Sequence, residues 1–238
     1  MFINPGSLRS DLDKVEEIEK ASLRLVTQAI YDFRETAALI FENEKDLVQD
    51  IGEDITREAL DKMGVSRIDE RLFGKIDYKR ARYIFHPEYA VRQALFVDSK
   101  AEDVRGQGTA TLQTAQTSLR IRHIRSNQPV DEPGKLPAVI QTTKAEYLTT
   151  TIFVKYNYTK PTEDSCRLVR IVIAALPSGM LQDLYNPTAA ETIWRAGRNA
   201  PTRGEPFRVR LVFNLLKQKK AWRVQTIPLA PDPFLWEN

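Results

Sequence analysis

The sequence predicts a globular protein of the α/β class, because helical and strand-like patterns occupy different parts of the chain. In residues 10–43 apolar side chains recur every three or four positions, as on one face of an amphipathic helix. Residues 149–158 and 168–174 are instead rich in β-branched and aromatic side chains, and residues 207–213 alternate between polar and apolar. With 238 residues, 42% of them hydrophobic, the chain can bury one substantial core.

The composition argues against a membrane protein, a secreted protein and a zinc-cluster protein. No apolar run is long enough to span a membrane, and the N-terminus lacks the basic start and long apolar stretch of a signal peptide. We therefore expect a soluble, cytoplasmic protein with no membrane partner. The single Cys166 cannot form an internal disulfide, and only two histidines, His86 and His123, are present, which argues against a zinc cluster.

Charge is segregated along the chain. Residues 1–70 contain 9 Lys and Arg against 17 Asp and Glu, whereas residues 71–238 contain 26 against 15. Within residues 195–223 nine basic side chains face one acid, Glu205. A basic surface of this kind favours a polyanion such as DNA or RNA, although a solvated surface is the alternative for any single residue.

Two helices are expected in the acidic part of the chain. The first spans residues 10–43, begins near Ser10, and is suited to packing or to a subunit interface. The second spans residues 53–63, after Gly52. Its first residue, Glu53, is either a surface cap or an acid that reaches a metal site on the adjacent sheet.

A charged hairpin follows. The run 83–85 and the run 94–101 are predicted strands, joined by the turn His86-Pro87-Glu88. Because side chains alternate along a strand, Asp98, Lys100 and Glu102 share one face. Two carboxylates and an ammonium group therefore meet on one surface of the predicted sheet.

Crowded carboxylates ionise together more easily when a divalent cation neutralises them. Mg²⁺ prefers hard oxygen ligands, and Asp77 with Asp98 could supply them, with Lys100 pointing at the same site. An Asp followed at a distance by Asp-x-Lys is a pattern of many metal-dependent nucleases. A solvated edge strand would carry the same residues, so the pattern alone leaves both readings open.

Composition predicts the remaining elements. Residues 102–108 are a predicted loop, and residues 109–125 a predicted helix beside the active strand. The helix carries Gln side chains for base edges and arginines for phosphates or guanines, unless it simply faces solvent. Residues 126–148 are a predicted long loop. A short helix at 185–194, an arginine-bearing loop at 197–204, a strand from Trp222 and a surface or partner-docking tail at 228–238 complete the expectation.

Segments along nearly the whole chain resemble the SfiI-like group of type II restriction endonucleases, which belongs to the PD-(D/E)xK nuclease superfamily. The segments that carry the resemblance are Gly52 to Thr56, Ile76 to Arg80, Val97 to Ala101, Thr111 to Gln113 with Gln116, Ile152 to Val154, Tyr185 to Pro187, Ala200 to Glu205, and Trp222 with Arg223. Signals in the same order along the chain are far more specific than one Asp-x-Lys.

The resemblance implies an α/β restriction-endonuclease-like core with a central mixed β-sheet flanked by helices. It places Asp77, Asp98 and Lys100 on the family's two metal-binding acids and active-site lysine. The implied activity is Mg²⁺-dependent hydrolysis of double-stranded DNA at a palindromic site, giving 5′-phosphate ends, by a homodimer or homotetramer. The metal site would comprise Asp77, Asp98 and the Ser99 backbone carbonyl, with Glu102 or Glu53 as further candidates.

One domain, residues 1–238, is expected to have three parts: an acidic helical part (1–70), the catalytic hairpin with its helix (71–125), and a basic, β-rich DNA-binding part with the tail (126–238). The candidates for DNA contacts are Lys79, Arg80, Gln113, Gln116, Arg120, Arg122, Arg198, Arg203, Arg208 and Arg210. Two features depart from the family pattern, namely the acid at Glu102 and the arginine cluster at 120–125. A non-catalytic DNA-binding module and a structure-selective repair nuclease of the same fold are the alternative functions.

Overall fold

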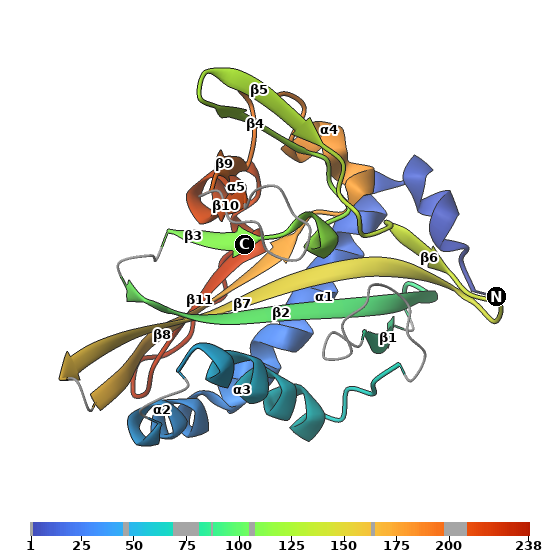
Figure 1. Ribbon diagram of the computed structural model, residues 1–238. Helices are drawn as coiled ribbons and strands as arrows, with labels where there is room; N and C mark the ends of the chain where they lie inside the picture. Colours follow the sequence, from blue (N-terminus) through green and yellow to red (C-terminus); the bar gives the residue numbers. More distant parts are fainter. Residues whose placement is uncertain are drawn as a thin grey trace.

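A mixed β-sheet forms the centre of the computed structural model, which describes residues 2–44, 48–68, 81–86, 88–104, 108–162, 165–197 and 209–238 (Figure 1). Its strands are ordered β1-β2-β7-β8-β11, with β6 also paired to β7. Strands β2 and β7 are parallel, and the other pairs are antiparallel. The bounds are β1 Arg82–His86, β2 Val91–Asp103, β6 Val139–Gln141, β7 Glu146–Thr162, β8 Ser165–Leu176 and β11 Val224–Pro228. The expected mixed sheet is confirmed.

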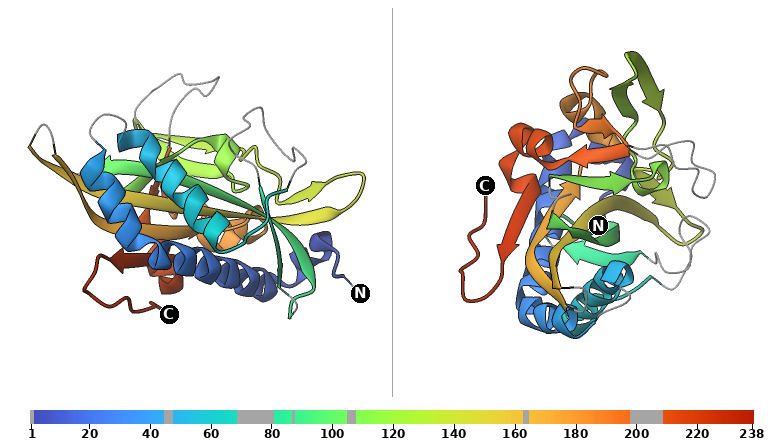
Figure 2. Two further views of the ribbon diagram at one scale, coloured as in Figure 1. Left: turned by 90° about the horizontal axis from the view of Figure 1, so that it is seen from below. Right: turned by 60° about the vertical axis from the view of Figure 1, so that its left-hand side comes forward.

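The N-terminal helices cover one face of this sheet (Figure 2, left). They are α1 (Leu12–Asp32), α2 (Arg34–Asn43) and α3 (Val48–Lys62), preceded by the 3₁₀ helix η1 (Pro5–Ser10). Buried side chains such as Leu23, Phe41 and Ile55 pack there against Ile152 and Tyr156 of β7. The prediction of one helix over 10–43 is wrong in two details. Helix α1 begins after Asp11, whose carboxylate caps it by accepting a hydrogen bond from the Lys14 amide (3.1 Å). The predicted single helix is also interrupted at Phe33, which separates α1 from α2.

A second layer lies over the other face. Strands β3 (Thr109–Leu112), β10 (Val209–Val212) and β9 (Trp194–Ala196) form a small antiparallel sheet in the order β3-β10-β9. Its buried side chains, including Leu112 and Leu211, belong to the same apolar cluster as Phe153 of β7. The remaining elements here are η3 Thr114–Gln116, β4 Ile121–Arg125, β5 Gln128–Glu132, η4 Gly179–Leu181, α4 Gln182–Tyr185, α5 Phe213–Lys219 and η5 Ala221–Arg223.

The predicted helix over 109–125 is wrong, because this stretch forms β3, η3 and β4. Leu119, Ile121 and His123 are all buried, and this alternation has the period of a strand. The predicted loop over 126–148 is also wrong. Strands β4 and β5 form a hairpin that projects from the body (Figure 1), through Ser126 and Asn127, which both have positive φ (48° and 60°).

Other boundaries also differ from expectation. The predicted loop at 102–108 begins later, since β2 continues to Asp103. The predicted helix at 185–194 is wrong: α4 ends at Tyr185, and β9 begins at Trp194. The strand expected from Trp222 begins at Val224, after η5.

The C-terminal tail folds back on its own chain. The Gln225 side chain donates to the Glu237 carbonyl (2.9 Å) and accepts from the Glu237 amide (3.0 Å). Phe234 and Trp236 pack against the apolar cluster to which α1 contributes, while Leu235 is 80% exposed. Across the described ranges, no helix has the length and apolar character needed to cross a membrane.

Arg82, the first residue of β1, ties this strand to the end of α3. Its buried guanidinium donates to the Asp61 carboxylate (2.8 Å) and to the Val65 carbonyl (2.6 Å), and Asp61 also pairs with Arg67. Partial burial opposes ionisation of Asp61, but hydrogen bonds from Arg67 and Arg82 hold its pKa below the ordinary 3.8.

This depressed pKa makes a prediction about acid stability. A group with a lowered pKa in the folded state stabilises the fold above its unfolded pKa, and this contribution is lost as the pH falls through the folded value. We expect Asp61→Asn to lower the thermal midpoint at neutral pH, and the difference from wild type to shrink below pH 3.8. Thermal unfolding across a pH series measures it, and a difference that stays constant down to about pH 3 would contradict the assignment.

Candidate active site

The central strand β2 carries the acid and the lysine that the sequence singled out. Asp98 and Lys100 lie on the same face, with 3.9 Å between the Asp98 Oδ2 and Lys100 Nζ atoms. Asp98 is 6% exposed, whereas the Lys100 side chain is 34% exposed and can be reached from solvent. The strand alternation predicted from the sequence is thus confirmed for this pair.

Lys100 is held from the second layer. Its Nζ donates to the Thr111 carbonyl of β3 at 2.9 Å, and it lies 5.9 Å from the centre of the Phe153 ring. The ammonium group therefore bridges the two sheets. A backbone carbonyl is a fixed acceptor, so this contact restricts the rotamers of a long and flexible side chain.

Helix α3 supports the strand from the opposite face. The Ser99 hydroxyl donates to Thr56 Oγ1 (2.7 Å), and Thr56 shares a second hydrogen bond with the Tyr156 hydroxyl (2.8 Å). Burial raises the pKa of Tyr156, which stays a neutral phenol. A Cβ at Gly52 would lie only 3.2 Å from the Ala101 amide and 3.3 Å from the Lys100 carbonyl carbon, so the glycine permits this close approach of α3 to β2.

Glu102 continues the charged face of β2, but its carboxylate binds another lysine. Lys155 of β7 lies 2.6 Å from Glu102 Oε2 and also donates to the Thr109 carbonyl of β3. Lys155 is fully buried, and this burial lowers the pKa of its ammonium group against the opposing effect of Glu102. Lys155 is not among the site residues predicted from the sequence. The available signal was a lysine inside the otherwise apolar run 152–156.

Several predicted site residues lie outside the described part of the chain. These are Asp77, Lys79, Arg80, Arg198, Arg203 and Arg208. Glu53 is exposed on α3, next to Gly52. Arg210 on β10 is flanked by Thr111 of β3 and Arg195 of β9. Like charges directly opposite each other in a sheet destabilise it, so the pair Arg195 and Arg210 suits a surface that meets an anion.

The other candidates for DNA contacts are engaged within the protein. Arg120 and Arg122 bind the Asp131 carboxylate at 2.8 and 3.3 Å, and these arginines hold its pKa below the ordinary value despite partial burial. The Gln116 side chain is 7% exposed and accepts from the Gln113 amide (2.7 Å). Arg223 is one of the nine basic residues of 195–223, but its side chain is fully buried, so its assignment to a basic surface is wrong.

The donor set around Asp98 suits a hard divalent cation, although the described residues bring together no group of three His, Cys, Asp or Glu side chains. Strand β1 pairs with β2 only as far as Leu95, so no described strand covers the outer edge of β2 at Asp98 to Lys100. The buried carboxylate of Asp98 at this strand edge is an oxygen ligand of the kind that Mg²⁺ takes.

Fold and site together define a protein with restriction-endonuclease architecture. The structure matches the crystal structure of BglI bound to its DNA recognition sequence with a TM-score of 0.75 and 16% identity, covering 95% of this chain and 94% of that one. It matches tetrameric SfiI bound to cognate DNA with a TM-score of 0.83 and 29% identity, covering 100% and 91%.

The sequence comparison is equally direct. The family described as type II restriction enzyme SfiI matches residues 31–227. Type II restriction enzyme SfiI from Streptomyces fimbriatus is 33% identical over 233 residues, which is 93% of this chain and 87% of that protein. The chain belongs to the SfiI family of type II restriction enzymes. The resemblance and the fold inferred from the sequence are thereby confirmed.

Proposed function

We propose that this protein is a site-specific endonuclease that uses Mg²⁺ to hydrolyse double-stranded DNA at a palindromic site, leaving 5′-phosphate and 3′-hydroxyl ends. The observation that carries the proposal is the pair Asp98 and Lys100, on one face of the central strand in a chain of the SfiI family. We place the protein in the cytoplasm, where it would meet its substrate.

Asp98, Asp77 and the Ser99 backbone carbonyl would hold the metal ion. Asp77 precedes Arg82 by five positions, and Arg82 pairs with Leu95, three positions before Asp98, so the connectivity is compatible with a shared site. When bound, Mg²⁺ lowers the pKa of a coordinated water and stabilises charge on the phosphate. Lys100 orients the attacking water and stabilises the negative charge that develops on the phosphoryl oxygens.

DNA would approach the face on which Lys100 is exposed. Arg195 and Arg210 lie on strands β9 and β10, and Thr111, the neighbour of Arg210 on β3, supplies the carbonyl that Lys100 binds. These two arginines are therefore suited to phosphate contacts, in addition to the candidates outside the described residues. Arg120 and Arg122 would have to exchange Asp131 for a phosphate. Since SfiI bound to cognate DNA is tetrameric, we propose a homodimer or homotetramer for this chain.

Cleavage of long, unmethylated duplex DNA tests this function. We expect discrete fragments with Mg²⁺ and none after chelation, and sequencing of the fragment ends gives the site and the phosphate position. A continuous smear, or cleavage confined to branched DNA, would favour a structure-selective nuclease. Intact DNA that still shifts in a binding assay would favour the non-catalytic binding module.

A further inference from the structure

Two lysines from neighbouring strands of the central sheet bind the same edge of β3. Lys100 of β2 and Lys155 of β7 are partners in the parallel register and point to the same face. The Lys100 ammonium donates to the Thr111 carbonyl and the Lys155 ammonium to the Thr109 carbonyl. Carbonyl groups two residues apart in a strand point to the same side, so both lysines occupy one edge of β3.

That edge has no strand beside it in the described part of the chain. In the small sheet β3 pairs only with β10, where Thr109 lies opposite Val212 and Thr111 opposite Arg210. The two ammonium groups thus take the place of a neighbouring strand as donors to β3. They attach the second layer to the central sheet directly above the candidate active site.

The two lysines differ in exposure and therefore in what they can do. Lys100 is 34% exposed and can meet a substrate, whereas Lys155 is fully buried and paired with Glu102 at 2.6 Å. A buried ammonium group whose charge is balanced by a carboxylate cannot contact DNA. Its available role is to hold β3, and through β3 the carbonyl that binds Lys100.

We propose that Lys155, with Glu102 as its counter-ion, is a positioning residue for Lys100 that acts through β3. This inference rests on the proposed nuclease function. Without the Lys155 ammonium group, the Thr109 carbonyl loses its donor and the Thr111 carbonyl is no longer fixed relative to β2. A displacement of about 1 Å in a catalytic group can slow a reaction about 100-fold. DNA affinity is spared, because it depends on many phosphate contacts.

The test compares Lys155→Met, Glu102→Gln and the double variant with wild type. We expect single-turnover cleavage to slow by about 10- to 100-fold in each, with the double variant no slower than the singles because every variant removes the ion pair between Lys155 and Glu102. The DNA Kd without metal ions and the Mg²⁺ concentration for half-maximal rate should stay at the wild-type values. A matched control makes the same two substitutions at the ion pair Lys14 and Glu17 of α1 (2.9 Å) and should cleave normally.

The outcomes separate the inference from the function on which it rests. If the wild type does not cut DNA, the proposed function fails. If the wild type cuts and Lys155→Met cuts equally fast, only the positioning role is overturned. A rate loss matched by an equal loss of DNA affinity would show a general structural role and overturn it as well. A raised Mg²⁺ requirement in Glu102→Gln alone would assign Glu102 to the metal and likewise overturn the proposal.

Discussion

Replacement of Lys100 by alanine should abolish DNA cleavage and leave most of the DNA affinity. The substitution removes the ammonium group that lies 3.9 Å from the Asp98 carboxylate and that we propose stabilises charge in the transition state. Loss of one such group costs about 10²- to 10³-fold in rate, and loss of water orientation adds to this. Binding persists because it is distributed over many phosphate contacts. Single-turnover cleavage and a filter-binding or gel-shift Kd measure the two quantities separately.

The control must remove a lysine of the same sheet that lies away from the site. Lys160, near the end of β7, is exposed, and Lys160→Ala should cleave like wild type. The thermal midpoint of Lys100→Ala should also be close to that of wild type, since the lost hydrogen bond to Thr111 is partly exposed. Full cleavage by Lys100→Ala would refute the active-site assignment.

The local sequence pattern is enough to predict that the two candidate catalytic residues share a face. Alternation along a strand places Asp98 and Lys100 together whatever the strand's neighbours are, and the structure confirms this placement. The same rule applies to Leu119, Ile121 and His123, but the polar residues 109–117 favoured a helix beside the active strand. Thr114, Gln116 and Thr117 are in fact buried, so tertiary packing overrode the pattern that polarity implied.

Long-range pairing could not be predicted from the sequence. Glu102 and Lys155 are 53 positions apart, and their contact depends on the parallel register of β2 with β7 and on the placement of β3. Periodicity gives the face on which a side chain lies, but it does not give the partner across the sheet. The sequence therefore left Glu102 as a candidate metal ligand, a role that remains a hypothesis beside its observed ion pair.

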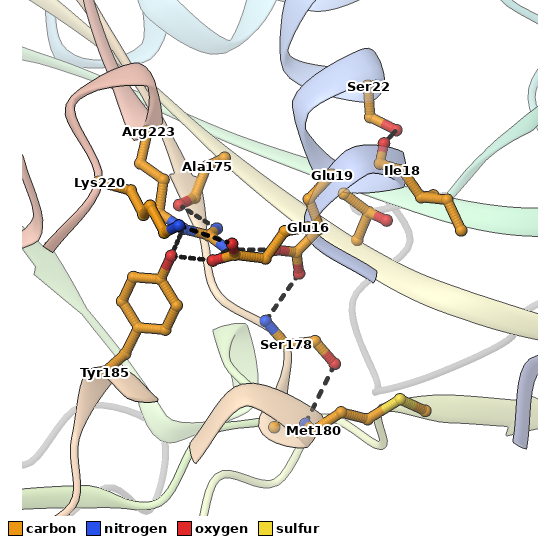
Figure 3. A network of polar contacts seen from close by, with 12 residues as sticks. Glu16, Ile18, Glu19, Ser22, Ala175, Ser178, Met180, Tyr185, Lys220 and Arg223 are labelled. Carbon is orange, nitrogen blue, oxygen red and sulfur yellow. Dashed lines mark hydrogen bonds and ion pairs between the residues drawn. The ribbon is translucent and has the colours of Figure 1, made fainter. Parts of the chain in front are cut away.

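The count of basic residues over 195–223 overestimates the basic surface, because it too ignores partners that are distant in the sequence. Arg223 contributes to the basic run 195–223, yet its side chain is fully buried and faces the acids of α1 (Figure 3). Its guanidinium binds Glu19 at 2.7 Å and Glu16 at 3.2 Å, and its Nε donates to the Tyr185 hydroxyl at 2.6 Å. The acids come from the N-terminal helical part, which the sequence suits to packing or to a subunit interface. Opposite charges that are segregated along the sequence are thus partly recombined in the interior.

This network joins α1 to three other parts of the fold. Glu19 accepts from the Ser178 amide (2.7 Å) after β8, Tyr185 donates to Glu16 from α4, and Lys220 lies 3.4 Å from Glu16 (Figure 3). Burial raises the pKa of Glu19, against the opposing effect of Arg223. The attraction of the Arg223 guanidinium therefore offsets part of the free-energy penalty of burying a charged Glu19 carboxylate.

Arg223→Met should accordingly lower the free energy of unfolding by about 3 to 5 kcal/mol, because it leaves buried carboxylates without their main cation. Urea denaturation with the midpoint and slope both fitted measures this loss. The control Arg57→Met breaks the exposed pair with Asp54 and should have little effect. Adding Glu16→Gln and Glu19→Gln to Arg223→Met should restore part of the stability, since neutral side chains no longer need the cation. A loss below about 1 kcal/mol in the single variant would mean that packing of α1 by apolar side chains, rather than this ion network, secures the helix against the sheet.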